Sequence, residues 1–566
     1  MRIDMKKVAF SAAGAYLCVS EITKQVWGAQ AEDGLWIRLA HGTAAADGVL
    51  ARIEVVRGEK PVAFAWEATP WRLQVIAGDG RIHMAFDDDG RLQMRGEGIS
   101  ARLAMPAGVG EEFLRYGDGM WDINCPRCRG RLMLRAAEGE IELYDPGVEE
   151  SGLSKVIEMS GERWGLAIED YVQSFAERPV RFDVDHWADW QQARFEGYAQ
   201  RFAADVPEPF QEAARAAAYV NLSATVRARG CYETDVMLMS KNWMRQVWTW
   251  DSAFNAVACA GYDDEMAWNN FAAPFRRQHQ GGRLPDSVNE YTWIDCYTKP
   301  PIHGWALSKL REAGVLTEAR REWIYPRLWK WAQSWYDTMD WDHDGMCQYN
   351  HGNDSGWDNC TNFKCGAPVE GPDLAAYLVL CWDELAVLAR EMGRDDESAA
   401  HAQRAEQQLS ALLEHSWDGE RFRVLHSGTH IEQQGVDSLF PFLPILLGDR
   451  LPSEVFAKLA AGLRRGGRFR TPHGLATESI MSPWYVNDGY WRGPIWAPPT
   501  MFIVEGLRKG GEADFAAELA EDFCTTCARG GFAENFDAHT GAGLRDRAYT
   551  WTSSVFLILA RGYLQA

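Results

Sequence analysis

The sequence holds no apolar stretch that approaches the ~20 residues needed to cross a bilayer. Its most apolar early segment, residues 8–19, follows a basic flank and superficially resembles a secretory signal. Asp4, the interrupting Gly and Ser residues and the lack of a clear cleavage site instead favour a first β-strand there. We therefore expect a cytoplasmic protein with no membrane partner.

Positively charged residues are also scarce. The 566 residues include 58 Lys and Arg against 80 Asp and Glu, which gives a formal net charge of −22 at pH 7. Such an excess of negative charge repels phosphate backbones and anionic lipid surfaces. Nucleic acid is therefore not an expected partner.

The 12 cysteines are too thinly spread to form a small disulfide scaffold. Two C-x-x-C pairs, Cys125 with Cys128 and Cys524 with Cys527, together offer the four thiolates of a zinc site. About 400 residues separate the pairs, and the second lies in a helical pattern where buried thiols commonly serve packing, so we do not expect zinc. The sequence contains no G-x-S-x-G, P-loop or H-E-x-x-H motif, which removes the commonest hydrolase, nucleotide-binding and zinc-protease classes.

Tryptophan, in contrast, is abundant. The chain has 26 Trp within an aromatic fraction of 12%, and its hydrophobic and charged fractions of 46% and 24% are typical of a soluble globular protein. Trp combines a flat apolar face with one N–H donor, which suits sugar rings as well as ordinary cores.

Residues 1–180 show the alternation of period two that predicts β-strands. Trp71, Leu73 and Val75 share one face, and turns at Asp79-Gly80 and Asp89-Gly90 indicate consecutive hairpins. An antiparallel sheet with one wet face needs a second layer over its apolar face, so we expect an N-terminal β-sandwich domain.

Residues 181–206 predict a partly helical linker, and residues 207–566 change to helical periodicity. The absence of a fixed-period repeat makes a closed ring of helix pairs, an (α/α)6 toroid, more plausible than a solenoid, so the fold class is mainly α. About twelve helices are expected, over residues 210–229, 251–261, 264–280, 302–313, 318–340, 372–392, 397–416, 437–447, 452–465, 495–509, 512–528 and 549–564.

Unusual residues gather in loop segments between these helices. The segments are 248–254, 283–305, 353–359, and 490–496 together with 532–537. Each mixes flat aromatic rings with carboxylates, although exposed loops gain little from Trp and buried carboxylates need partners. A rigid scaffold commonly presents its binding residues on such loops. Including the start of the last helix, the candidate substrate-binding residues are Trp248, Trp250, Asp251, His303, Trp305, Trp357, Tyr490, Trp491, Arg492, Trp496 and Trp551.

Cleavage of a glycosidic bond is the chemistry that this composition suits. The reaction needs one protonated carboxyl near the leaving oxygen and one carboxylate that activates water or attacks the anomeric carbon. A neighbouring Trp packs on the sugar and raises the pKa of an adjacent carboxyl. Asp358, directly after Trp357, is the best candidate for the general acid, and Glu534, between Phe532 and Phe536, is the best candidate for the base.

Both carboxyls also have structural interpretations. Asp358 is able to cap its turn, although Asp354 already offers a local cap. Glu534 is able to form a structural ion pair with Arg545 or Arg547.

Three of the candidate binding residues have structural alternatives as well. Asp251 suits a helix N-cap as much as a contact to sugar hydroxyls. Arg492 suits a bridge between loops as much as an anchor for a carboxylate in the site. His303 follows a Pro-Pro pair, and the interpretation as a satisfied core histidine is slightly favoured.

The run Asp340-Trp-Asp342-His-Asp344-Gly resembles the first half of a calcium loop. The twelfth position is His351 instead of the bidentate Glu, so a solvated turn is the favoured interpretation. A calcium site at Asp340, Asp342 and Asp344, completed by a carboxylate from elsewhere, is the alternative. No cofactor is otherwise expected.

Taken together, the loop motifs resemble those of glycoside hydrolase family 63 and its trehalase-like relatives, in the same order over roughly residues 240–560. The resemblance implies an (α/α)6 barrel, an inverting mechanism on an α-linked sugar, Asp358 as general acid and Glu534 as general base. It also implies that Trp250, Asp251, Trp491 and Arg492 line the pocket. The motifs are Trp250-Asp251-Ser-Ala-Phe254, Ser355-Gly-Trp357-Asp358-Asn359, Tyr490-Trp491-Arg492-Gly-Pro494-Ile-Trp496, Glu534-Asn-Phe-Asp537 with Thr540-Gly541, and Tyr549-Thr-Trp551-Thr-Ser553.

The sequence therefore predicts a hydrolase of a terminal α-glucosidic or α-mannosidic bond in an oligosaccharide or small glycoside. A sugar isomerase or lyase on the same toroid is one alternative, although only His303 and His351 lie near these loops. A glycan-binding protein without activity is the other. Arg283, Lys299 and Arg492 lie near the predicted mouth, so an acidic aglycone stays open, as do the sugar and the oligomeric state.

Overall fold

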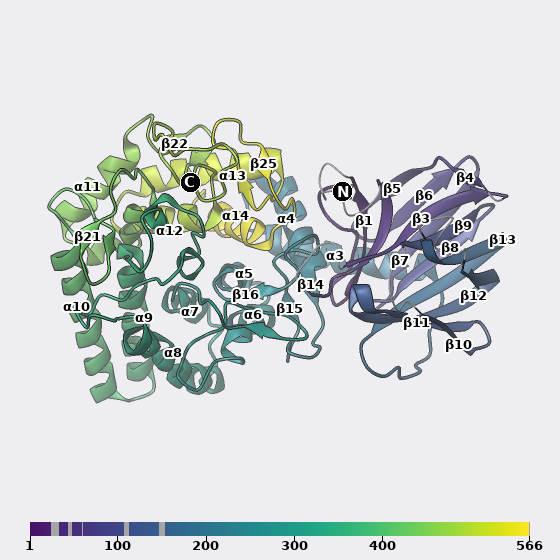
Figure 1. Ribbon diagram of the computed structural model, residues 1–566, viewed down its shortest axis with the longest axis horizontal. Coiled ribbons are helices and arrows are strands. Elements are labelled where there is room, and N and C mark those ends of the chain that lie inside the picture. Colours follow the sequence, from purple (N-terminus) through teal and green to yellow (C-terminus); the bar gives the residue numbers. More distant parts are fainter. Residues whose placement is uncertain (24–32, 43–47, 59, 107–111, 146–152, 565–566) are drawn as a thin grey trace. The chain divides into compact units, whose positions relative to one another are not determined.

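A computed structural model describes residues 1–566 apart from residues 24–32, 43–47, 59, 107–111, 146–152 and 565–566. The chain divides into two compact units (Figure 1). The first comprises Met1–Arg201, Ala218–Gln246 and Asn289–Tyr291, and the second comprises Phe202–Ala217, Val247–Val288 and Thr292–Ala566. The chain therefore passes between the units several times.

The first unit is built on one antiparallel sheet. Its 13 strands pair in the order β1-β2-β3-β9-β13-β8-β7-β6-β5, with β4 on β3 and with β12, β11 and β10 joined in succession to β13. The strands are β1 (Leu17–Ile22), β2 (Gly34–Leu39), β3 (Val49–Arg57), β4 (Lys60–Val62), β5 (Ala65–Ala68), β6 (Leu73–Ala77), β7 (Gly80–Phe86), β8 (Leu92–Glu97), β9 (Ser100–Pro106), β10 (Glu112–Gly117), β11 (Met120–Cys125), β12 (Gly130–Tyr144) and β13 (Leu153–Tyr171).

The hairpins predicted from the alternating pattern are confirmed. Leu73 of β6 pairs with Met84 of β7, which in turn pairs with Met94 of β8, and all three side chains are buried. The first strand begins later than the apolar run 8–19 suggests, because β1 starts at Leu17 and the preceding residues form turns.

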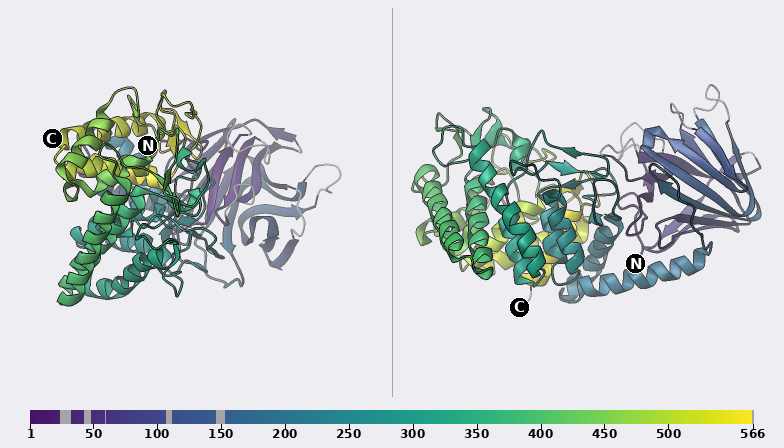
Figure 2. Two further views of the ribbon diagram at one scale, coloured as in Figure 1. Left: turned by 60° about the vertical axis from the view of Figure 1, so that its left-hand side comes forward. Right: turned by 90° about the horizontal axis from the view of Figure 1, so that it is seen from below.

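Helix α3 (Val184–Ala203) covers part of this sheet (Figure 2). Val184, Trp187 and Ala188 pack together with Ala85 of β7 in one buried cluster. The Asp183 carboxylate accepts a hydrogen bond from the His186 backbone N–H at 3.1 Å, as expected of a residue that caps a helix N-terminus.

A buried polar cluster joins distant parts of the first unit. His41 Nδ1 lies 3.0 Å from Glu290 Oε1, and its Nε2 lies 3.6 Å from Asp170 Oδ2. Burial by itself lowers the pKa of His41, but hydrogen bonds and charge from Asp170 and Glu290 outweigh burial and raise it. Arg229 also pairs with Asp170, so an imidazole and an arginine lie against two carboxylates in the interior.

The second unit is helical. Successive helices pack against each other in α5–α6, α9–α10 and α12–α13 (Figure 1). Its helices, with α4 shared between the units, are α4 (Gln211–Ala224), α5 (Asp251–Cys259), α6 (Asp264–Phe275), α7 (His303–Glu312), α8 (Glu318–Thr338), α9 (Pro372–Glu391), α10 (Asp395–Ser416), α11 (Ser453–Arg464), α12 (Ala497–Lys509), α13 (Ala513–Gly530) and α14 (Thr550–Gly562). None of the described helices is both long and apolar enough to cross a membrane.

These helices lie close to the ranges predicted from periodicity, with one exception. The segment predicted as a helix over 437–447 is a 3-10 segment, η6 (Phe440–Arg450), which is kinked at Gly448. Pro441 and Pro444 lack backbone N–H donors and stand three residues apart, which interrupts the regular hydrogen bonding of an α-helix.

Burial distinguishes two kinds of helix in the second unit. Almost every residue of α5, α12 and α14 is buried, whereas α10 and α13 bury only one face. The long connections between helix pairs carry short strand pairs, β16 (Val247–Trp248), β17 (Ser287–Val288), β18 (Trp293–Ile294), β19 (Val369–Glu370), β20 (Leu425–His426), β21 (Ile431–Glu432), β22 (Arg470–Thr471), β23 (Gly474–Leu475), β24 (Asn535–Phe536) and β25 (Gly543–Leu544). The candidate site residues lie on or beside these connections.

Candidate active site

The turn that presents Asp358 depends on a glycine. Gly356 follows the 3-10 turn Gly352–Ser355 and has φ of +73°, a conformation that favours glycine. A Cβ atom at this position would lie 2.5 Å from the ring of Trp250. Because Gly356 has no Cβ, its backbone is able to lie against the Trp250 ring. The next two residues are Trp357, which is buried with its ring 4.8 Å from that of Trp491, and Asp358, which is half-buried.

Asp354, four residues earlier, fastens this loop to its neighbours. Its carboxylate accepts hydrogen bonds from the backbone N–H of Thr298 at 3.0 Å and of Asn350 at 3.1 Å. The cap expected of Asp354 is made instead by His351, whose side chain accepts from the Asn353 N–H, and the bonds of Asp354 reach the segment that carries Lys299.

Lys299 and Asp286 set the charge around Asp358. The Lys299 ammonium lies 2.8 Å from Asp286 Oδ1 and donates to the Asn353 carbonyl at 2.7 Å. Burial raises the pKa of Asp358, and the positive charge of Lys299 opposes that rise. From the sequence, Lys299 was noted only as a cation near the mouth of the predicted pocket. Asp286 was not selected, and its only indication in the sequence was its position in the loop 283–305.

Glu534 lies at the opening of the β24–β25 hairpin. Its backbone N–H donates to the Asp546 carbonyl at 2.7 Å, and its Oε1 accepts a hydrogen bond from the Tyr490 hydroxyl at 3.1 Å. The residue is 5% exposed, and burial raises its pKa to about 8, with Asp546 adding to the rise. Within the described chain Glu534 has no ion pair, and Arg545 pairs with Asp488 instead.

Tyr490, whose hydroxyl donates to Glu534, lies in a segment that is bonded to the loop of Asp358, since the Trp491 N–H donates to Asn359 Oδ1 at 2.9 Å. Burial raises the pKa of Tyr490, and the charges of Glu534, Asp358 and Asp251 raise it further. The three carboxyls therefore act on one hydroxyl group. Tyr490 has φ of +63°, a strained conformation for a residue with a Cβ, of the kind that is often found at functional sites.

Asp251 does not cap its helix. It is the first residue of α5, and the N-cap residue is Trp250, which makes no side-chain cap hydrogen bond. Asp251 Oδ1 instead accepts a hydrogen bond from the Tyr549 hydroxyl at 3.1 Å. Burial raises the pKa of Asp251 to about 8, although Lys299 opposes the rise. Tyr549 belongs to a motif that the sequence analysis quoted, but it was not selected as a site residue.

Five of the predicted tryptophans form one aromatic wall. The rings of Trp491 and Trp496 stack at 3.9 Å with 7° between their planes, and Trp551 meets Trp496 edge-on at 5.5 Å. Trp250 lies 6.1 Å from Trp491 and 5.6 Å from Trp551, and Trp357 completes the group against Trp491. All five are buried, so most of this wall holds the loops in place, and the Trp491 indole N–H has no partner among the described residues.

The remaining candidates fall into two groups. Trp248 and Arg492 are half-buried, and the Arg492 Nε has no hydrogen-bond partner in the described part of the chain. His303 and Trp305 are enclosed: His303 Nε2 is 3.2 Å from the Thr249 carbonyl and its Nδ1 accepts from the Trp331 indole, while the Trp305 indole donates to Glu505. Burial lowers the pKa of His303 to about 3, so it is a neutral core residue.

The acidic loop 340–344 gathers further ionisable groups. The carboxylates of Asp340, Asp342 and Asp344 lie within 4.8 Å of one another, and Asp344 forms a second group of that size with Glu370, His415 and His430. His430 Nε2 is 3.0 Å from Asp342 Oδ2. The four C-x-x-C thiols, Cys125, Cys128, Cys524 and Cys527, are all free and buried, and none joins a possible metal group among the residues described.

The family model of the mannosylglycerate hydrolase MGH1-like glycoside hydrolase domain matches residues 244–552. The chain belongs to this family. The match contains both Asp358 and Glu534 and the whole aromatic wall, and it identifies the protein as a glycoside hydrolase.

Individual relatives agree with the family. A mannosylglycerate hydrolase of Rubrobacter radiotolerans is 24% identical over 404 residues, which cover 55% of this chain and 89% of that protein. A glucosylglycerate hydrolase of Mycolicibacterium hassiacum is 22% identical over 408 residues, which cover 55% of this chain and 91% of that protein. Among solved structures, a bacterial glucoamylase in complex with acarbose shares the fold over 99% of this chain and 94% of its own, with a TM-score of 0.65 and 10% identity.

Proposed function

We propose that the protein is an inverting α-glycosidase that hydrolyses a terminal α-mannosidic or α-glucosidic bond. The observation that carries this proposal is the junction of two loops beside a tryptophan wall. Asn359, next to Asp358, bonds to Gly489 and Trp491, and Tyr490 between them donates to Glu534. An inverting glycosidase needs two carboxyls on opposite sides of the sugar, separated by roughly 6.5–9.5 Å to leave space for a water.

In the proposed reaction Asp358 donates its proton to the glycosidic oxygen as the bond to the anomeric carbon breaks. Glu534 removes a proton from a water molecule, whose oxygen attacks the anomeric carbon from the opposite face. The Tyr490 hydroxyl holds the Glu534 carboxylate in place. Asp251, held by Tyr549, is proposed to bind sugar hydroxyls, as are Trp248, Trp250, Trp491 and Arg492.

Electrostatics favours a second assignment of the two roles. Asp546 and Asp251 add to the proton affinity of Glu534, whereas Lys299 favours the ionised form of Asp358. In this second assignment Glu534 is the general acid and Asp358 is the general base, the reverse of the roles described above. Substrates with different leaving groups separate the two assignments, because a good leaving group departs without protonation but still needs an activated water.

The experiment compares Asp358→Asn and Glu534→Gln on a natural glycoside and on a glycosyl fluoride. Loss of the acid spares the fluoride, whereas loss of the base removes about 10²–10⁴-fold of the rate on both substrates. If Asp358→Asn alone keeps activity on the fluoride, Asp358 is the acid. The reverse pattern exchanges the roles, and wild-type turnover of the natural glycoside by both variants contradicts the site.

The aglycone is proposed to be a small organic acid such as glycerate. The names of the two relatives support this proposal, and so does Arg492, whose guanidinium Nε is unpartnered among the residues described. Proton NMR of mannosylglycerate and glucosylglycerate during hydrolysis identifies the sugar and the anomer first released. A β-anomer supports inversion, an α-anomer indicates retention, and binding without product supports the alternative of a glycan-binding protein.

The finer architecture belongs to the same proposal. We infer an N-terminal β-sandwich domain over residues 1–180, a linker over 181–206 and an (α/α)6 toroid over 207–566. The alternation between fully buried helices, such as α12 and α14, and one-sided helices, such as α13, supports two concentric layers.

The acidic loop is proposed to have no part in the reaction. Its carboxylates have imidazole partners in His430 and His415, and two imidazoles among the donors suit a transition metal better than calcium, which prefers oxygen ligands. If the loop binds a cation, the cation therefore serves stability, and hydrolysis needs no cofactor.

A further inference from the structure

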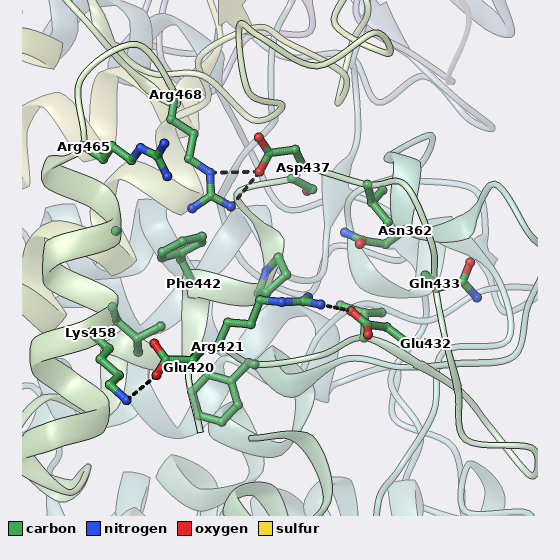
Figure 3. A pocket seen from close by; sticks show the side chains of 17 residues that line it. Asn362, Glu420, Arg421, Glu432, Gln433, Asp437, Phe442, Lys458, Arg465 and Arg468 are labelled. Carbon is green, nitrogen blue, oxygen red and sulfur yellow. Dashed lines mark hydrogen bonds and ion pairs between the residues drawn. The ribbon is translucent and has the colours of Figure 1, made fainter. Parts of the chain in front are cut away.

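A second cavity lies apart from the proposed catalytic residues, none of which lines it. It has a volume of about 350 Å3 and lies between helix α11 and the segments 420–424 and 432–442 (Figure 3). Small-molecule sites typically have volumes of about 300–1,000 Å3, so the cavity has room for a small ligand.

Charged side chains make up much of the cavity lining. Four cations and three carboxylates line it, and each carboxylate pairs with one cation: Glu420 with Lys458, Glu432 with Arg421, and Asp437 with Arg468. Two of the cations that line the cavity are also neutralised from outside it: Arg421 lies 3.7 Å from Asp418, and Lys458 lies 3.1 Å from Glu454. Arg465 makes no ion pair in the described chain, and Figure 3 shows its guanidinium turned toward that of Arg468. Arg465 is therefore the lining cation without a carboxylate partner in the described chain, and its guanidinium and that of Arg468 form the part of the lining that suits an anion.

The rest of the lining suits a polyhydroxylated body. The ring of Phe442, which is 8% exposed, lies below the two arginines, and the Arg468 guanidinium is 5.2 Å from its centre. Gly462 of α11 keeps room for this ring, because a Cβ there would lie 2.7 Å from it. Gln433 is 5% exposed, and its Oε1 has no hydrogen-bond partner among the described residues, so a buried acceptor is available for a ligand hydroxyl.

We propose that this cavity is a second ligand site, which binds a small polyhydroxylated anion such as a sugar acid or a sugar phosphate. The anionic group lies between Arg465 and Arg468, and the polyol extends from there into the cavity. The site is separate from hydrolysis, so the proposal stands or falls independently of the assigned activity.

The test is isothermal titration calorimetry of the full chain carrying Glu534→Gln, with glucuronate, glucose 6-phosphate, inorganic phosphate and glucose as separate probes. We expect binding of glucuronate or glucose 6-phosphate, and the tighter of the two identifies the anionic group. Arg465→Ala should weaken that binding at least about tenfold, since it removes a charge-assisted contact. Arg464→Ala is the matched control, because Arg464 pairs with Glu512 and does not line the cavity.

Each other outcome contradicts the proposal. Binding that Arg465→Ala leaves unchanged places the ligand elsewhere, and glucose binding as tightly as the charged probes removes the role of the arginines. Phosphate binding as tightly as glucose 6-phosphate removes the role of the polyol contacts. Hydrolysis by Arg465→Ala in the chain that keeps Glu534 should equal that of the wild type, which separates a failure at this cavity from a failure of the proposed function.

Discussion

At the scale of single residues, the tyrosine that donates to Glu534 controls the proposed chemistry. Burial raises the pKa of Glu534, and the hydrogen bond from Tyr490 opposes part of that rise. Tyr490→Phe should therefore raise the pKa of Glu534, and a base must be ionised to act. The acidic limb of the profile of kcat against pH should move to higher pH, by up to about one unit.

The matched control for this prediction is Tyr549→Phe, which removes a hydroxyl bound to Asp251 rather than to Glu534. It should leave the acidic limb closer to its wild-type position than Tyr490→Phe does. A shift of the alkaline limb in Tyr490→Phe would instead mean that Glu534 is the acid. An unchanged profile in Tyr490→Phe would contradict any ionisation of Glu534 in the reaction.

Sequence reasoning selected side chains by chemical type and by neighbours in the chain, and this limited what it was able to find. Asp358 and Glu534 stand beside aromatic residues in the sequence, so their chemistry was visible there. Asp286 became relevant only through Lys299, a partner brought close by folding. His303 was included among the binding candidates although the core interpretation was slightly favoured, and the core interpretation agrees with the structure, in which both of its nitrogens are satisfied.

At the scale of elements, the turn before Asp358 is the most constrained connection in the site. Gly356→Ala would add a Cβ both to a residue at positive φ and against the Trp250 ring. We expect this variant to lower the free energy of unfolding, measured in urea, by more than the roughly 1–2 kcal/mol that an alanine in the left-handed conformation costs by itself. We also expect a strong decrease in kcat, measured from initial rates.

Gly345→Ala is a suitable comparison, because Gly345 has φ of +87° and open space around its missing Cβ. This variant should show the cost of backbone strain alone and keep its activity. Equal loss of activity in both variants would show that the Trp250 contact is unimportant.

The loop 340–344 gives a prediction about metal removal. Dialysis against EDTA should leave kcat within about twofold, because no group of this loop belongs to the proposed catalytic set. A cation held by Asp344, Glu370 and the two histidines would instead raise the melting temperature of the folded protein. Loss of turnover on dialysis, restored by a divalent metal, would contradict this separation.

Helix positions were largely predictable because amphipathic periodicity is local information. The helix α9 runs from Pro372 to Glu391, close to the range 372–392 read from its apolar spacing. The η6 segment was wrongly predicted as an α-helix because its apolar residues have helical spacing, whereas its two prolines prevent regular helical hydrogen bonding. The pairing of β13 with both β9 and β8 was also beyond local patterns, since it joins residues far apart in the chain.

At the scale of the whole molecule, the two units are interleaved along the chain. Residues Asn289–Tyr291 belong to the first unit, although the segments on either side belong to the second. Glu290 fixes this short segment, since its Oε1 contacts His41 Nδ1 and accepts from the Gly42 N–H at 3.1 Å. The same chain segment carries Asp286 and Lys299 on its two sides.

Glu290→Ala should therefore destabilise the protein by about 3–5 kcal/mol, as expected when one partner of a buried pair is removed. The measurement is urea unfolding at neutral pH, together with kcat, which should fall because Asp286 and Lys299 lose their anchored connection. Glu454→Ala is the control, since its pair with Lys458 is exposed and worth at most about 1 kcal/mol. Equal stability of the two variants would contradict the anchoring role.

The interleaving also governs the order in which a nascent polypeptide is able to mature. When translation has reached Arg201, Asp170 is already present as one partner of His41, but Glu290 is still almost ninety positions from being translated. A fragment ending at Arg201 should consequently remain sensitive to protease, whereas the full-length chain resists it. We therefore expect the first unit to complete its buried ionic cluster only after part of the second unit has been synthesised.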